Sequence, residues 1–482
     1  MMQKITKYTI YSAIAVILTF QGCKDAYFED VTLNPNQVTT PTLSSLLATS
    51  TYKIAQNNVN AASITNPFVQ YIANPSPNAA SDIYDANDQS GTWNALYYAM
   101  ADANELKKLA IAQNANEYLG AANVMLAYNL ILANDLWGGV PFSQAFVATT
   151  LKPKYDSDQA IYASSMALID EAIANFNAAS TGTLLPIGAT NSDLIYGRVS
   201  TAATPNKVYW KKFAYALKAR LLNKVSKTAG YNPTAVLAAL SNSFTSNADD
   251  AGMNNFLVRN NWAGVAVSNA AQSLGGWLSE QLVDHLNGTS YGIFDPRIAK
   301  ITDKAPANGL YIGTTNGQGN RPPGGNTTKD EVYIAQSSPW TSDTAPIWIV
   351  TYAELKFIEA EAALAAGSTV QANSAYQAGI TANFDKLQVP AGAERTAYLA
   401  AAFVPATKDL IFREKYVATY LNPEAWNDAR RYDYAYKNFT LPLGAVLPTY
   451  IRRIDYVRDE INENNSNVPP TVPRTTKLWW DQ

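Results

Sequence analysis

Two carboxylates stand on one face of the most apolar helical segment that the sequence predicts. Glu354 and Glu361 are seven residues apart, so they share a helix face with Phe357 and Leu364. Paired carboxylates can act as general acid and base in glycoside hydrolysis. They can also be halves of buried ion pairs, because an unpaired buried charge is very costly. Their location on a helical packing face favours ion pairing. The candidate partners are Arg413, Arg430 and Arg431.

Other residues that could perform catalysis lack partners at a useful spacing. The chain has one histidine, His285, which cannot form a typical histidine-containing metal cluster. Asp284 beside it does not face it in a helix. The neighbouring acids Asp249-Asp250 and Asp330-Glu331 are adjacent in sequence, and adjacent residues rarely converge on one bond. The sequence therefore predicts no enzyme, no metal site and no cofactor, and a structural or exposed His285.

Aromatic residues in the stretches without helical periodicity are the main candidates for ligand binding. Sugar rings have apolar faces that pack on aromatic planes, while neighbouring polar groups bond the hydroxyls. Each ring could instead fix its own loop to the rest of the protein. The candidates are Phe68, Tyr71, Tyr84, Trp262, Trp277, Tyr291, Tyr311, Tyr333 and Trp340.

The elements that must position these residues are mostly helices. Apolar residues recur at helical spacing in eight blocks, and four tryptophans on these blocks are expected in the core. The blocks are 93–100, 119–137, 162–176 with Asp156 or Ser157 as the N-cap, 210–225, 350–364, 372–387, 408–421 and a segment after Pro423. The tryptophans are Trp93, Trp137, Trp210 and Trp426, and we expect Trp479-Trp480 to dock the C-terminal tail.

Three long stretches, 57–90, 180–207 and 230–345, lack this periodicity. Such long loops usually bind something or are disordered, and their aromatic content argues against disorder. Gly317 and Gly319 fall in a segment with no preceding strand, so we interpret them, with Gly324-Gly325, as loop flexibility and not a phosphate cradle. The pattern predicts a mainly α fold of paired helices with a loop-rich layer on one side. No 34-residue repeat is evident.

The N-terminal residues have the pattern of a secretory signal. Lys4 and Lys7 precede an apolar run at 8–20, which is too short for a membrane-spanning helix. No later segment has about 18 uninterrupted apolar residues.

Cys23 follows this run. Because it is the only cysteine of the chain, it cannot form an internal disulfide. The preceding residues, Phe20-Gln21-Gly22, resemble the lipobox of bacterial lipoproteins, in which the cysteine is lipidated. Lys24-Asp25 and Glu29-Asp30 resemble the signal that sends some lipoproteins to the cell surface. We therefore expect a lipoprotein signal peptide at 1–22, a lipidated tether at 23–42 and one domain at 43–482. A cleaved signal with an incidental cysteine is the alternative.

Composition excludes one class of partner and allows a large core. The net charge is −3, which gives no basic footprint for nucleic acid. Hydrophobic residues make up 47% of the chain, enough for a substantial core, and charged residues only 16%. A surface poor in charge suits a protein outside the cytoplasm.

Segments in order along the chain together resemble the SusD/RagB family of nutrient-binding outer-membrane lipoproteins. The short Asn427-Asp428-Ala429-Arg430-Arg431 segment is closer to the second SusD-like branch. The matching segments are the lipobox-like start, Asn34-Pro35-Asn36, 93–97, 135–143, the helix from Tyr209 to Arg220, Asp295-Pro296-Arg297, 351–362, Arg413-Glu414, 424–431 and 448–462.

The resemblance implies four tetratricopeptide-like helix pairs facing an irregular ligand-binding half. It also implies a cell-surface lipoprotein on the outer membrane that passes an oligosaccharide to a SusC-like, TonB-dependent transporter. Peptide capture remains an alternative within the family. A surface glycosidase and a purely structural surface protein remain alternatives outside it.

Overall fold

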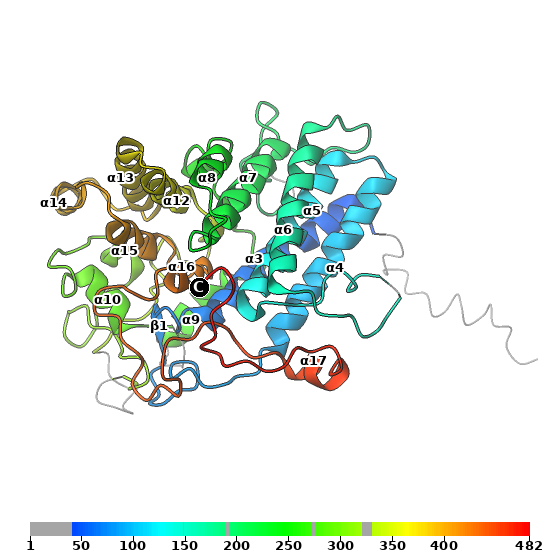
Figure 1. Ribbon diagram of the computed structural model, residues 1–482. Coiled ribbons are helices and arrows are strands. Elements are labelled where there is room, and N and C mark those ends of the chain that lie inside the picture. The colour runs from blue at the N-terminus through cyan, green and yellow to red at the C-terminus, as the bar shows by residue number, and fades with distance from the viewer. Residues whose placement is uncertain (1–40, 148, 189–191, 271–275, 321–329) are drawn as a thin grey trace, which may run out of the picture. The chain divides into compact units, whose positions relative to one another are not determined.

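The fold is described by a computed structural model for residues 41–147, 149–188, 192–270, 276–320 and 330–482. Helices dominate it, and the four strands are short (Figure 1). The helices are α3 (Leu43–Thr65), α4 (Ser90–Ala112), α5 (Asn116–Trp137), α6 (Asp158–Asn177), α7 (Asn206–Lys224), α8 (Pro233–Leu240), α9 (Asn261–Ala270), α10 (Glu280–Asn287), α11 (Ile298–Ile301), α12 (Tyr352–Ala365), α13 (Thr369–Lys386), α14 (Ala393–Ala402), α15 (Lys408–Ala418), α16 (Glu424–Arg431) and α17 (Arg458–Glu463), with a short 3-10 turn η1 (Asn247–Asp249). The strands are β1 (Ile72–Ala73), β2 (Ala251–Met253), β3 (Trp277–Leu278) and β4 (Ile347–Val350).

Successive helices pack on one another and form what we call the helical scaffold. Each helix from α3 to α8 packs on the next, α8 packs on α12, and α12 packs on both α13 and α15 (Figure 1). The mainly helical, paired architecture predicted from the sequence is therefore confirmed. Ser157 caps α6, as expected, by accepting a hydrogen bond from the backbone N–H of Ala160.

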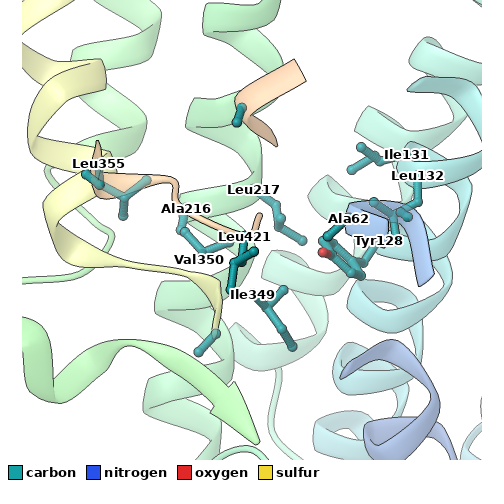
Figure 2. Close-up of a cluster of buried hydrophobic side chains, with 14 of the residues drawn as sticks. Ala62, Tyr128, Ile131, Leu132, Ala216, Leu217, Ile349, Val350, Leu355 and Leu421 are labelled. Carbon is teal, nitrogen blue, oxygen red and sulfur yellow. The ribbon is translucent and has the colours of Figure 1, made fainter. Parts of the chain in front are cut away.

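The core lies where α3, α5 and α7 meet β4. Figure 2 shows Ala62, Tyr128, Leu217 and Ile349 converging there, all fully buried. Helix α5 is buried along nearly its whole length because apolar residues occur all round it. The Tyr128 hydroxyl is satisfied by donating to Asn58 Oδ1 at 2.7 Å.

The described residues between these helices, within 66–88, 241–346 and 432–457, form what we call the loop layer. Two small antiparallel sheets tie it together, one pairing β1 with β3 and the other pairing β2 with β4. The first sheet joins two loop segments about 200 residues apart in sequence, Ile72 lying opposite Leu278. The predicted loop-rich layer is therefore present, held by long-range contacts.

Some predicted boundaries were wrong. Helix α3 continues to Thr65, although 57–90 was predicted to be irregular. Buried Asn57 and Asn58 interrupt the apolar pattern of this helix, and hydrogen bonds to α5 satisfy them. Short helices α8 to α11 also occur within 230–345.

The end of the chain is buried, as expected of a docked tail. Trp480 is fully buried beside Val225, and Trp479 packs edge-on against Tyr162 at a ring distance of 5.2 Å. Trp93, Trp137, Trp210 and Trp426 are all in the core, as predicted. Cys23 and the predicted signal peptide lie outside the described residues. Among the described helices, none has the length and apolar character needed to cross a membrane.

Candidate functional site

The paired carboxylates of α12 form ion pairs within the helical scaffold. Arg220 on α7 donates to both oxygens of Glu354, at 2.8 and 2.7 Å, and also to the carbonyl oxygen of Ile349 at 3.0 Å. Arg431 pairs with Glu361, whose other contact is Asn223 at 3.0 Å. Although burial opposes its ionisation, Glu361 has a lowered pKa because Arg431 is so close. These carboxylates therefore stabilise helix packing and are not exposed to a substrate.

Of the three predicted partners, only Arg431 pairs with either glutamate. Arg430 lies over the ring of Trp426 at 3.7 Å and donates to two backbone carbonyls, and Arg413 lies over Tyr291 at 4.3 Å. Arg220 was not among the partners predicted from the sequence. The signal available was its position three residues after buried Leu217, which places a charge on the packing face of α7.

The remaining polar candidates are also structural. His285 is buried, stacked on Tyr416 at 5.1 Å and packed edge-on against Tyr291 at 4.8 Å. Burial, together with the charge of Arg413, lowers its pKa well below the usual value, so the ring is neutral. Of the acids that are adjacent in sequence, Asp249 forms an ion pair with Lys212, and Asp250 forms one with Lys386. The described part of the chain contains no group of three or more histidines or acids that could hold a metal ion.

The structure divides the nine predicted ligand-binding aromatics into two groups. Six are buried: Phe68, Tyr71, Tyr84, Trp262, Trp277 and Trp340. Contacts of Phe68, Tyr71 and Trp340 fix the loop layer to the scaffold. Tyr71, for example, donates its hydroxyl to the carbonyl oxygen of Tyr416, and Trp340 donates its indole N–H to Tyr420 at 3.0 Å.

Tyr291, Tyr311 and Tyr333 are half-buried and keep part of their surface in solvent. Tyr291 is covered by Arg413, and Tyr333 packs against Trp277 at 5.6 Å. Tyr311 instead packs beside Phe294 at 6.3 Å and lines a cavity. Among the three, Tyr311 therefore has the most favourable position for contact with a ligand.

Two adjoining cavities in the loop layer form what we call the loop groove. They have volumes of about 300 and 450 Å³ and share Glu280 and Asp284, both on α10. The first is lined mainly by amides and hydroxyls, including Gln70, Ser279, Gln281, Asn316, Gln318 and Asn438. The second adds the apolar surfaces of Phe294, Leu310 and Tyr311. The groove thus combines aromatic surface with hydrogen-bonding groups.

The aromatic wall of the groove is anchored to the scaffold by a buried ion network. Phe294 is 40% exposed and directly precedes Asp295. Asp295 bonds Arg297 at 2.6 Å, and Arg297 also bonds Glu414 of α15 at 2.6 Å. Phe294 was absent from the predicted candidates, although it lies in the same irregular stretch as Tyr311. The criterion that selected Tyr311 would have selected Phe294 as well.

The polar wall is fixed by a buried carboxylate. Asp82 Oδ2 accepts hydrogen bonds from the backbone N–H groups of Asn74 at 2.9 Å and Gly317 at 3.2 Å. Burial raises the pKa of Asp82 from 3.8 to about 6. Asn316, which directly precedes Gly317, accepts a hydrogen bond from the Ser279 hydroxyl at 2.6 Å. The 315–318 segment is therefore tied both to the 74–82 loop and to the start of α10.

The interpretation of Gly317 and Gly319 as flexible positions needs correction. Gly317 has φ +84°, and an added Cβ would lie 2.0 Å from the carbonyl oxygen of Leu443. Gly319 has φ +79°, and its Cβ would lie 2.6 Å from the carbonyl oxygen of Pro75. Glycine is required here because two backbone segments approach closely at a left-handed conformation. Gly324-Gly325 lie outside the described residues.

Known structures share this fold over nearly the whole chain. A SusD/RagB family protein from Bacteroides thetaiotaomicron aligns with a TM-score of 0.73 at 20% identity, covering 92% of this chain and 99% of that one. A chitin-binding protein aligns with a TM-score of 0.73 at 22% identity, covering 92% and 100%. A chitin-binding SusD homolog from Flavobacterium johnsoniae aligns with a TM-score of 0.70 at 18% identity, covering 90% and 98%. These likenesses establish the fold.

Sequence comparison places the chain in a family. No curated protein matches it. Residues 35–444 match the SusD-like_2 family, described as starch-binding and associating with the outer membrane. The match spans most of the chain and includes both the helical scaffold and the loop groove. The chain therefore belongs to the SusD-like_2 family of binding proteins associated with the outer membrane.

Proposed function

We propose that this protein captures a neutral oligosaccharide in the loop groove and performs no chemistry on it. The main support is the composition of the groove: Tyr311 and Phe294 line one of its cavities, and amides and hydroxyls line the adjoining one. Apolar sugar faces pack on such rings, and the hydroxyls bond carboxylates, amides and hydroxyl groups. Starch and chitin fragments are the first ligands to test, because the family description names starch and two similar structures bind chitin.

The same proposal includes membrane anchoring and delivery. Cys23 carries several lipid chains, which hold the protein on the outer face of the outer membrane. Several chains anchor a protein more firmly than one. The captured glycan then passes to a TonB-dependent, SusC-like transporter. Mass spectrometry of the membrane-extracted protein should find diacylglycerol-type modification at Cys23, and crosslinked membranes should yield an outer-membrane barrel partner. An unmodified thiol at Cys23 would contradict the anchoring.

The test of binding compares two tyrosines that both have surface in solvent. Tyr311 lines the groove, whereas Tyr98 lies on scaffold helix α4 and is 64% exposed. Tyrosine is enriched among the contact residues whose replacement costs more than about 1 kcal/mol of binding free energy, at least about fivefold in Kd. Calorimetry with maltotetraose and chitotetraose should therefore show weaker binding for Tyr311→Ala and unchanged binding for Tyr98→Ala.

Three outcomes would redirect the proposal. Equal loss in both variants, or none in either, would place the ligand elsewhere. Binding of peptides but of no glycan would favour the peptide-binding alternative. Shortened sugars in the incubation mixture would indicate a glycosidase.

A further inference from the structure

A second pair of adjoining cavities lies beside the C-terminal part of the chain, and we call it the C-terminal cleft. One cavity, of about 240 Å³, is formed by the end of α3, the 81–92 segment and the 451–455 segment. The other, of about 470 Å³, is formed by residues 453–472. Both include Ile454 and Asp455, so they are continuous.

The first cavity has the chemistry of a sugar site. Its apolar surface comes from Ile64, Phe68 and Ile454, and Phe68 is one of the predicted ligand-binding aromatics. Its rim carries polar side chains that include an acceptor, Asp85, a donor, Arg474, and groups able to do both, Asn60, Ser63, Asn87 and Gln89. One apolar surface surrounded by mixed donors and acceptors suits a ring that has an apolar face and a rim of hydroxyls.

The cleft is held in shape before any ligand binds. Arg474 donates to the carbonyl oxygen of Tyr84 at 2.5 Å and lies 3.5 Å from Asp455. The indole N–H of Trp137, a core residue, donates to the carbonyl oxygen of Asp455 at 3.0 Å. Asp88 accepts from the backbone N–H of Arg458 at 2.9 Å. A preformed site avoids the cost of ordering its walls during binding.

The cleft and the loop groove are lined by different residues of one segment of the loop layer. Phe68 lines the cleft, whereas Gln70, two residues later, lines the loop groove. In the same segment, Ser81 lines the cleft and Asp82 bonds Gly317 in the wall of the groove. The two sites therefore have no lining residue in common and can be altered separately.

We infer that the C-terminal cleft is a second saccharide site, for one end or branch of a neutral glycan, and this rests on the proposed function. The volume of about 240 Å³ lies below the usual range for pockets that hold drug-sized ligands, so the first cavity takes a single sugar ring. When one long glycan occupies both sites, its second binding step is intramolecular. The effective concentration at the second site is then high, and the apparent affinity rises.

The test blocks the cleft from helix α3. Ser63 is exposed at the rim and its hydroxyl donates to Val59 in the preceding turn, so Ser63→Trp fills the cleft from the solvent side. Thr49→Trp is the matched control, because Thr49 is also exposed on α3 and donates to Ser45 in the same way. The two positions are about 21 Å apart along the helix.

Calorimetry with maltotetraose and chitotetraose should give two sites for the unmodified chain and for Thr49→Trp, and one site for Ser63→Trp. Gln89→Ala, which removes one rim amide without adding bulk, should weaken binding at the cleft by at least about threefold. Unchanged stoichiometry and affinity in Ser63→Trp and Gln89→Ala would overturn the inference.

Tyr311→Ala separates this inference from the proposed function. If the unmodified chain has one site and Tyr311→Ala removes it, the loop groove binds and the cleft does not. If Tyr311→Ala has no effect and Ser63→Trp removes all binding, the cleft is the only site and the assignment to the loop groove fails. Absence of binding to any variant would overturn both.

Discussion

The helical scaffold and the polar wall of the loop groove use buried charge in different ways. In the scaffold, a buried charge pairs with an opposite charge on another helix, as Arg220 does with Glu354 and Lys415 does with Asp428. In the polar wall of the groove, Asp82 instead accepts hydrogen bonds from backbone N–H groups. Scaffold charges therefore set how helices pack, whereas Asp82 sets the course of the backbone around the groove. Changes in the first should cost stability, and changes in the second should alter binding as well.

The largest expected effect is the loss of a scaffold ion pair. Arg220→Met leaves Glu354 buried without its partner, which typically costs about 3–5 kcal/mol. Lys218→Met, two residues earlier, removes an exposed pair with Asp170 and should cost less than about 1 kcal/mol. Denaturant unfolding of both variants measures the difference. Similar costs for the two would contradict the account of the scaffold.

Gly317→Ala tests whether the polar wall of the groove depends on a glycine. The new Cβ would meet the Leu443 carbonyl oxygen in a left-handed conformation, so we expect a loss of at least about 2 kcal/mol and weaker glycan binding. Gly292→Ala is the control: it also has positive φ, +71°, but nothing lies within 4 Å of its Cβ. It should lose about 1 kcal/mol and keep its affinity. Intact affinity in folded Gly317→Ala would separate this wall from binding.

The charge on Asp82 should make stability depend on pH. Its pKa is raised from 3.8 to about 6, so between these values the folded chain keeps a proton that the unfolded chain has lost. The contribution of Asp82 to the unfolding free energy is therefore greatest below about pH 4 and falls by about 3 kcal/mol as pH rises through 6.

Asp82→Asn removes this titration. Its unfolding free energy relative to the unmodified chain should rise by up to about 3 kcal/mol between about pH 4 and pH 7. Urea unfolding at several pH values measures this difference, in which the other titrating groups cancel. A difference that does not vary with pH would show that Asp82 is not the titrating group.

The smallest expected effect is on Tyr71, a predicted ligand-binding residue that is buried, unlike Tyr311. Tyr71→Phe removes a buried hydroxyl that bonds Tyr416, which should cost about 1–2 kcal/mol of stability. Its glycan affinity should stay unchanged, because no face of Tyr71 is exposed. Calorimetry on the folded variant checks this, and a loss of affinity matching that of Tyr311→Ala would remove the distinction between the two groups.

The sequence predicted the helices well where local pattern decides, and less well where distant contacts decide. Helix α5 was evident because apolar residues recur at helical spacing from Leu119 to Trp137, whereas α3 was missed because Asn57 and Asn58 find their partners on α5. Local periodicity contains no information on such partners. Arg220 and Glu354 likewise pair across 134 positions of sequence.

The same limit explains the outcome for the candidate site. An aromatic residue in an irregular stretch can face solvent, as Tyr311 does, or fold back into the core, as Tyr71 does to reach Tyr416, 345 positions away. Both have the same local signature. Only the tertiary fold distinguishes a ring that lines a groove from one that anchors a loop.

The structure of the chain bound to chitotetraose or maltotetraose tests the central claim most directly. The account predicts a sugar ring packed on Tyr311 and Phe294, with its hydroxyls within hydrogen-bond distance of polar groups along the loop groove. A sugar bound only to the outer surfaces of the scaffold helices, with the loop groove filled by solvent, would contradict it.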